Sequence, residues 1–98
     1  MRTIMVLNWD GFTKENYETI RKTVKWETEP PKGLVFHVAG FHNNVMRVTD
    51  IWESADDFNN FVKARLMPAT IAAGITTEPR VEMFPVHSVH VPSPELVG

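Results

Sequence analysis

The chain of 98 residues contains no cysteine. This absence excludes disulfides, thiolate nucleophiles, iron–sulfur clusters and cysteine-based zinc sites. The chain also has no Gly-rich phosphate loop, nucleophile elbow or metalloprotease helix, which disfavours phosphoryl transfer and serine-hydrolase chemistry. No Lys/Arg block stands out at a net charge of −2, and no apolar run is long enough to span a membrane. We therefore expect no nucleic-acid or membrane partner and a cytoplasmic location.

The composition favours one small globular domain. Apolar residues make up 43% of the chain, and a domain of this size buries only about 60 to 70% of the surface of its unfolded chain. A sheltered site is hard to build inside so small a core, so a homodimer is expected. We predict a single domain over residues 1–91, followed by a C-terminal tail over residues 92–98 that Pro92 and Pro94 release.

The periodicity of apolar residues predicts four strands and two helical regions. Thr13 and Ser54 are placed as N-caps, and Pro68 is expected to break or restart the second helical region. Pro85 favours an edge position for the last strand, because proline cannot donate to a central ladder. The predicted strands cover residues 4–9, 34–39, 45–52 and 80–91, and the helices begin at residues 14 and 55.

This order, β-α-β-β-α-β, is that of the ferredoxin-like α+β fold, with both helices on one face of a four-stranded antiparallel sheet. One face of the sheet is then left without helices. Its strand residues are too hydrophobic to face water, so a second copy is the simplest cover.

The second and third strands are predicted to pair around a four-residue loop, residues 41–44. Side chains alternate along a strand, so His37, Asp50 and Trp52 share one face and Phe36 and Val38 the other. The apolar set that includes Phe36 and Val38 suits the helices. His37 and Asp50 are then expected on the helix-free face, as diagonal neighbours that long side chains can bridge.

His37 and Asp50 are the predicted catalytic pair. The carboxylate would hold one imidazole nitrogen while the other meets a substrate as a general base. The alternative is a structural hydrogen bond within the core or the dimer interface. A metal centre built from His37, Asp50 and His87 is a further alternative, because two histidines and a carboxylate suit iron or zinc. Nothing in the spacing demands a metal, so none is predicted.

Five more residues form the predicted substrate-binding set. Trp52 would line an aromatic pocket or simply fill the core, and Asn8 would orient a ligand carbonyl or bond the backbone. Arg65 would receive a carboxylate or phenolate at the pocket mouth, or pair with an acidic neighbour at the surface. Phe61 and His87 complete the set.

One stretch resembles a known family. The strand end Val48-Thr49-Asp50-Ile51-Trp52-Glu53-Ser54, followed by Ala55-Asp56-Asp57-Phe58 and a helix, is similar to the dimeric α/β-barrel superfamily, particularly its antibiotic-biosynthesis-monooxygenase-like members. The resemblance implies that two ferredoxin-like subunits pack sheet against sheet and that a ligand cavity lies on the helix-free face. Members include cofactor-independent oxygenases of aromatic polyketides, haem-degrading oxygenases, isomerases and dehydratases.

The resemblance disfavours haem degradation. Haem-degrading members look similar at Asn8, but their haem-ligating histidine falls near Ile71, and Phe61 stands where they have a distorting tryptophan. In the polyketide oxygenases a tryptophan comparable to Trp52 lines the cavity. We therefore expect a cofactor-independent monooxygenase acting on a small apolar or aromatic, polyketide-like metabolite. The alternatives are an isomerase or cyclase in which His37, oriented by Asp50, transfers the substrate's proton, and a non-catalytic ligand-binding or structural homodimer.

Overall fold

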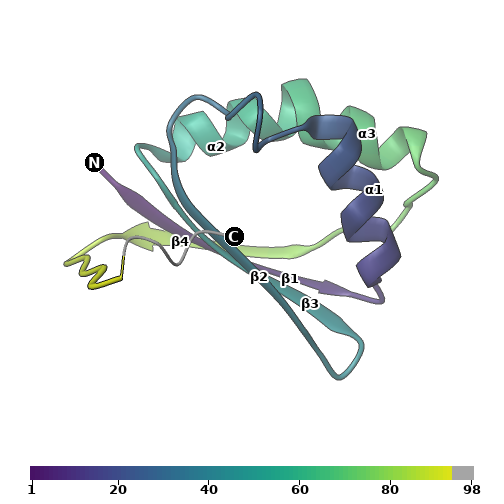
Figure 1. Ribbon diagram of the computed structural model, residues 1–98, viewed down its shortest axis with the longest axis horizontal. Coiled ribbons are helices and arrows are strands. Elements are labelled where there is room, and N and C mark those ends of the chain that lie inside the picture. The colour runs from purple at the N-terminus through teal and green to yellow at the C-terminus, as the bar shows by residue number, and fades with distance from the viewer. Residues whose placement is uncertain (94–98) are drawn as a thin grey trace.

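The computed structural model describes residues 1–93 (Figure 1). The elements are β1 (Thr3–Asp10), α1 (Lys14–Val24), β2 (Leu34–His42), β3 (Val45–Trp52), α2 (Ala55–Phe61), the π-helical segment η1 (Val62–Leu66), α3 (Met67–Ala72) and β4 (Arg80–Pro85). Within the described part, no helix is both long and apolar enough to cross a membrane. From residue 94 on, the predicted C-terminal tail lies outside the described residues.

The four strands form one antiparallel sheet in the order β2-β3-β1-β4. The helices α1, α2 and α3 lie on one side of this sheet, and the other side carries none of them (Figure 1). The predicted α+β ferredoxin-like fold is therefore confirmed, including the edge position of β4.

Side-chain caps set where the helices begin. The Thr13 hydroxyl accepts from the backbone N–H of Asn16 at 3.0 Å, and the Asn16 side chain accepts from the Thr13 N–H at 3.1 Å, which together make a capping box. The Ser54 hydroxyl accepts from the Asp57 N–H at 3.1 Å and begins α2. Both predicted N-caps are confirmed.

Pro68 continues the second helical region rather than ending it. It lies at the start of α3, directly after η1, and the Met67 N–H bonds to the Val62 carbonyl one residue beyond the α-helical partner. A π-turn of this kind fits a proline, because proline has no N–H and would clash with the carbonyl four residues back in a regular helix.

The last strand is shorter than predicted. β4 ends at Pro85, not at residue 91. Pro85 pairs with Thr3 in the β1–β4 ladder, and the next backbone N–H, that of Val86, bonds to the Arg2 carbonyl. The proline is accommodated because β4 has a neighbour on one side only.

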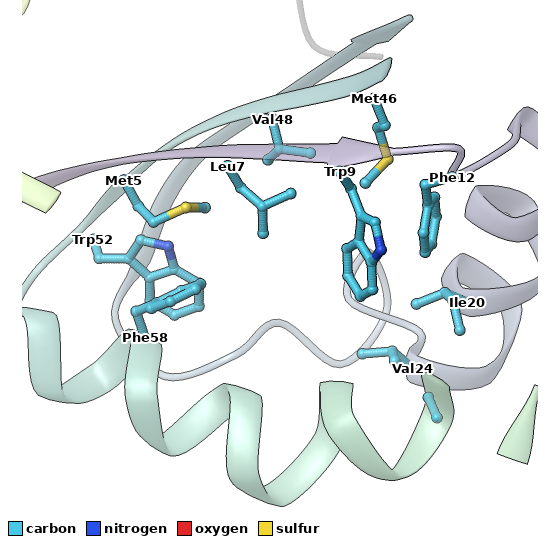
Figure 2. Close-up of a cluster of buried hydrophobic side chains, with 11 residues drawn as sticks. Met5, Leu7, Trp9, Phe12, Ile20, Val24, Met46, Val48, Trp52 and Phe58 are labelled. Carbon is cyan, nitrogen blue, oxygen red and sulfur yellow. The ribbon is translucent and has the colours of Figure 1, made fainter. Parts of the chain in front are cut away.

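The core lies between the sheet and the helices. Met5, Leu7 and Trp9 project from β1 toward the helical layer (Figure 2). Trp52 is 1% exposed and packs edge-on against Phe58 of α2, with ring centroids 5.5 Å apart. The remaining buried apolar residues are Phe12, Ile20, Val24, Met46, Val48 and Ala69.

The predicted assignment of the two faces is wrong. Asp50 and Trp52 face the helices, whereas Phe36 and Val38, expected against the helices, are 42% and 49% exposed. The prediction correctly grouped the β3 residues that share a face, but it assigned each group to the wrong side of the sheet. The reason is that both faces are apolar, so hydrophobicity did not distinguish the covered face from the uncovered one.

The pairing of β2 with β3 also differs from the prediction. The hairpin loop has two residues, Asn43 and Asn44, both with positive φ, and His42 pairs with Val45. A register shift between Leu34 and Phe36 marks a β-bulge. Because the loop is two residues shorter than predicted, His37 lies directly opposite Asp50 instead of diagonally across from it.

Candidate active site

Three polar side chains form a connected row on the helix-facing side of β2 and β3. The Nδ1 atom of His37 lies 2.7 Å from Oδ1 of Asp50, and Nε1 of Trp52 donates to Oδ2 of Asp50 at 3.0 Å. Both carboxylate oxygens of Asp50 therefore have partners, although the residue is only 5% exposed. A buried carboxylate needs such partners to offset its desolvation.

Tyr17 of α1 extends the row at its other end. Its hydroxyl lies 2.8 Å from Nε2 of His37, and the planes of the two rings are nearly parallel, with an interplanar angle of 4°. Burial is the main cause that raises the pKa of Tyr17 above its ordinary value of 10.0, and the nearby charge of Arg21 opposes that rise. We call the four residues Tyr17, His37, Asp50 and Trp52 the polar relay.

The polar relay borders a cavity of about 70 Å³ between the sheet and the helices. Tyr17, His37, Asp50 and Trp52 all line it, and the rest of its wall is apolar. The other lining residues are Met5, Leu7, Trp9, Phe12, Ile20, Trp26, Pro31, Leu34, Met46, Val48, Phe58, Phe61 and Leu66. The relay is therefore a polar group of side chains set in an otherwise hydrophobic hollow.

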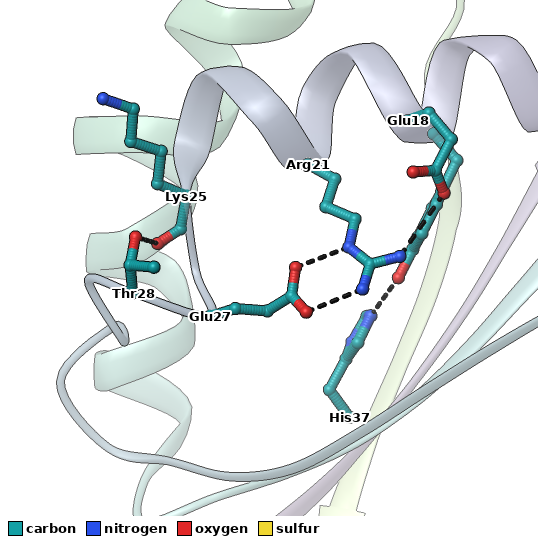
Figure 3. A network of polar contacts seen from close by, with 7 residues as sticks. Glu18, Arg21, Lys25, Glu27, Thr28 and His37 are labelled. Carbon is teal, nitrogen blue, oxygen red and sulfur yellow. Dashed lines mark hydrogen bonds and ion pairs between the residues drawn. The ribbon is translucent and has the colours of Figure 1, made fainter. Parts of the chain in front are cut away.

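A surface ion pair lies beside the outer end of the relay. Arg21 donates to both carboxylate oxygens of Glu27, at 2.5 and 2.6 Å, and lies 3.5 Å from Glu18 (Figure 3). The hydrogen bonds from Arg21 lower the pKa of Glu27. In the same view His37 lies next to this pair, and its dashed line marks the bond to Tyr17. The outer end of the relay is thus the partly exposed one, with the His37 side chain 23% exposed.

A larger groove of about 690 Å³ adjoins the cavity. It runs between the second helical region and strands β1 and β4, where Val81 and Met83 form part of its floor. Four residues line both hollows and separate them: Leu7, Trp9, Phe58 and Leu66. Trp9 also donates from Nε1 to the Thr77 hydroxyl at 2.8 Å, which fixes the wall of the groove.

The predicted site residues divide into two groups. His37, Asp50, Trp52 and Phe61 all line the cavity, and Phe61 lies 5.5 Å from Trp52 between ring centroids. Asn8 does not join them. It alternates with the buried Leu7 and Trp9 along β1, so it belongs to the helix-free face.

Arg65 and His87 also lie apart from the relay. The Arg65 guanidinium donates to the backbone carbonyls of Val24 and Glu29, at 2.7 and 2.6 Å. It therefore ties the end of α1 and the following loop to η1. His87 is exposed beyond the end of β4.

The alternative metal centre is not assembled. Within residues 1–93, no three His, Asp or Glu side chains gather closely enough to hold a metal ion. His37 and Asp50 meet, but His87 does not join them. The three side chains weighed as ligands are therefore not brought together.

Tyr17 is the site residue that the sequence reasoning missed. In the sequence it recurs with Ile20 and Val24 at the spacing of one helix face, which indicates packing and no chemical role. Its hydroxyl was the available signal, because a tyrosine on the core-facing side of a helix needs a hydrogen-bond partner there. Trp26, whose ring centroid lies 5.4 Å from that of His37, was missed as well.

The sequence matches no protein-family model and no curated protein. Solved structures with the same fold do exist. NE2512 from Nitrosomonas europaea, a protein of unknown function, superposes with a TM-score of 0.68 at 10% identity, over 94% of this chain and 95% of that one.

Two further structures are of oxygenases. SnoaB, a cofactor-independent oxygenase from Streptomyces nogalater, has a TM-score of 0.63 at 14% identity, over 94% of this chain and 97% of SnoaB. A monooxygenase, ActVA-Orf6 of Streptomyces coelicolor, in complex with nanaomycin D, has a TM-score of 0.59 at 12% identity, over 93% and 92%. The resemblance inferred from the sequence is confirmed at the level of the fold: this chain is an α+β ferredoxin-like protein with the fold of the antibiotic-biosynthesis-monooxygenase-like group.

Proposed function

We propose that the chain is a cofactor-independent monooxygenase acting on a small aromatic or polyketide-like metabolite. The observation that carries this proposal is the bond between His37 and Asp50 at the wall of an apolar cavity. The fold shared with SnoaB and ActVA-Orf6 supports the same class. The apolar lining suits an aromatic substrate, and the histidine provides a base for removing a proton from it.

The base works through a fixed tautomer. An ionised Asp50 can only accept, so Nδ1 of His37, 2.7 Å from Oδ1, carries the proton and Nε2 carries the lone pair that receives one. Once protonated, the imidazolium remains paired with the Asp50 carboxylate. A positioned base of this kind accelerates a reaction by about a hundred- to ten-thousand-fold.

The substrate class that fits is a methylene made acidic by aromatic rings conjugated with a carbonyl, or an equivalent phenol or quinol. Loss of a proton leaves a carbanion, which gives one electron to dioxygen. The two radicals then combine into a C–O bond, and the peroxide anion takes back the proton held by His37 to form a hydroperoxide. This peroxide loses water to leave a ketone, so that R₂CH₂ and O₂ become R₂C=O and H₂O. The substrate supplies all the electrons in this balance.

The size of the two hollows limits how such a substrate binds. Sites for drug-sized ligands measure about 300 to 1,000 Å³, a range that includes the groove of about 690 Å³ but not the cavity of about 70 Å³. We therefore place the body of the substrate in the groove. Its reacting edge would reach the relay past Leu66 and Phe58, which line both hollows.

Oxygen uptake tests the proposal. The purified chain is mixed with anthrone, which has an acidic methylene, and with a panel of phenols, quinols and lactones, and dioxygen consumption is followed. We expect uptake that His37→Ala abolishes and that His42→Ala, an exposed histidine at the end of β2, leaves unchanged. Turnover without oxygen uptake would refute the oxygenase assignment in favour of an isomerase or cyclase that uses the same base. Undiminished uptake by His37→Ala would refute the assigned base.

We also propose that the chain is a homodimer through its helix-free sheet face. Four apolar side chains lie in one row across the four strands there: Phe36, Ile51, Ile4 and Phe84. Phe36 and Phe84 are 42% and 44% exposed in the single chain. An apolar row of this kind favours burial against a self-complementary partner.

A further inference from the structure

We propose that Tyr17 is the group that touches the substrate, taking up the substrate's proton while it hands its own proton to His37. This inference rests on the proposed function, and it changes which atom performs the first step. His37 becomes the proton store behind Tyr17, and Asp50 becomes the counter-charge of that store.

The direction of the hydrogen bonds in the relay supports this assignment. Trp52 can only donate, so its bond at 3.0 Å occupies one oxygen of Asp50. The other oxygen, 2.7 Å from Nδ1, requires a proton on that nitrogen when Asp50 is ionised. A neutral imidazole with its proton on Nδ1 accepts at Nε2. Tyr17, 2.8 Å from Nε2, is therefore the donor.

While this bond is formed, a substrate cannot reach the acceptor atom of His37 directly. Nε2 has a single lone pair, and the Tyr17 hydroxyl occupies it. The phenolic oxygen, in contrast, keeps lone pairs that accept a proton from outside. Of the two groups, Tyr17 is thus the one that keeps a free acceptor, and its side chain lines the cavity.

The proton balance needs no additional reactant. The Tyr17 O–H bond breaks as its proton moves to Nε2, and a new O–H bond forms with the proton leaving the substrate. Tyr17 ends unchanged, His37 gains one positive charge next to Asp50, and the substrate gains one negative charge. Tyrosinate never has to exist alone, which matters because burial raises the pKa of Tyr17.

The surroundings hold Tyr17 in this position. Its ring lies edge-on to Trp26 and to Phe41, with centroids 5.5 and 6.1 Å away. The charged groups that act on it are Arg21 and Glu18 on α1, Glu27 on the following loop, and Asp50 on β3. Burial and the three carboxylates raise the pKa of Tyr17 and outweigh the opposing charge of Arg21, so the hydroxyl remains a neutral donor near neutral pH.

The tautomer of His37 provides a test that does not require a substrate. Nitrogen NMR of the full chain, with His37→Gln used to assign the signal, should show the proton on Nδ1 and a bare, hydrogen-bonded Nε2. A proton on Nε2 would make Tyr17 the acceptor and would overturn the inference.

Kinetics with anthrone separate this inference from the proposed function. Tyr17→Phe keeps the ring and should lower kcat by about a hundred- to ten-thousand-fold, with KM little changed. If Tyr17→Phe is fully active and His37→Gln is inactive, the inference fails and the proposed function stands. If both variants are fully active, both proposals fail.

A second measurement distinguishes chemistry from misfolding. The chain has one tyrosine, so growth on fluorinated tyrosines of graded acidity changes the Tyr17 hydroxyl alone. A hydroxyl that transfers a proton makes kcat vary with its acidity. A constant kcat across the folded, fluorinated proteins would overturn the inference.

Discussion

The imidazole of His37 and the carboxylate of Asp50 meet across the β2–β3 ladder, with Nδ1 2.7 Å from Oδ1. They lie on the covered side of the sheet, where Asp50 is 5% exposed. A buried polar group that loses its hydrogen-bond partner lowers the stability of the fold, so substitution of either His37 or Asp50 should be destabilising.

Asp50→Asn tests that sensitivity. An amide presents one acceptor and one NH₂ group where two donors, Nδ1–H of His37 and Nε1–H of Trp52, now find oxygens. One donor is left facing another donor, or the histidine changes tautomer. We expect a loss of about 1 to 3 kcal/mol in the free energy of unfolding, measured by urea denaturation, together with loss of turnover.

Glu78→Gln is the matched control for this substitution. Glu78 lies in the loop before β4, is exposed, and has no ion pair among the described residues. Its loss of charge should change the free energy of unfolding by less than about 0.5 kcal/mol. Equal stability of the two variants would contradict the buried role of Asp50.

Much of the fold followed from local signals in the sequence. Thr13 and Ser54 are the observed N-caps, and the third strand runs from Val45 to Trp52 as predicted. Such features depend on residues close together in the chain. That His37 and Asp50 meet was also foreseeable, because a two-residue loop and a four-residue loop give the same side-chain parity.

Local sequence signals did not indicate which face of the sheet the helices cover. Phe36 and Val38 are as apolar as residues that pack against helices, yet they face outward. When the uncovered face of a sheet is also hydrophobic, the polarity of the residues does not indicate which face the helices cover. The contact between Tyr17 and His37 depends on how α1 lies over β2, a tertiary relation that no local pattern carries.

Alkaline pH should reveal the burial of Tyr17. Desolvation raises its pKa above 10.0 in the folded chain, so the unfolded chain releases the proton first. This contribution to stability is fully present below about pH 10 and is lost as pH rises through the folded pKa. Tyrosinate absorbance follows one residue here, since the chain has a single tyrosine. In Tyr17→Phe the decrease in the free energy of unfolding that comes from Tyr17 at alkaline pH should be missing. Identical pH dependence of stability in the variant and the wild type would contradict the prediction.

Arg65→Met should affect stability and not substrate affinity. Methionine keeps an unbranched stem but removes the two hydrogen bonds to the Val24 and Glu29 carbonyls. Hydrogen bonds from a charged group contribute about 1.5 to 3 kcal/mol, and partial exposure places the expected loss near the lower end. Thermal unfolding measures it. A large rise in KM with unchanged stability would return Arg65 to the substrate-binding set.

Gly33→Ala should be more damaging than Gly74→Ala. Both glycines have positive φ, 87° and 76°, but a Cβ at Gly33 would collide with Oδ2 of Asp57 and lie 2.7 Å from its Cβ, whereas one at Gly74 meets nothing within 4 Å. The left-handed conformation costs both variants about 1 to 2 kcal/mol, and Gly33→Ala must also displace Asp57. Equal losses of stability in urea would show that the Asp57 side chain moves freely.

The proposed homodimer is tested at the aromatic ends of the apolar row, Phe36 and Phe84. Phe36 on β2 and Phe84 on β4 occupy the two edges of the helix-free face. A glutamate at either position places a charge where the partner's apolar surface would lie, which is costly to desolvate. We expect Phe36→Glu and Phe84→Glu to shift the molecular mass in light scattering from dimer toward monomer.

The control for that experiment is Ile71→Glu. Ile71 is 68% exposed on α3, on the opposite side of the sheet, so its charge should leave the dimer intact. Dissociation by the two sheet variants alone locates the interface on the helix-free face. A wild-type chain that is monomeric at micromolar concentration would refute the dimer. Dissociation by Ile71→Glu alone would instead place the interface on the helical layer.

The polar relay should survive loss of the dimer. Its side chains face the helices and not the partner subunit, so a folded monomeric variant should retain the hydrogen bonds of the relay. The His37 tautomer, measured by nitrogen NMR in that variant, checks this.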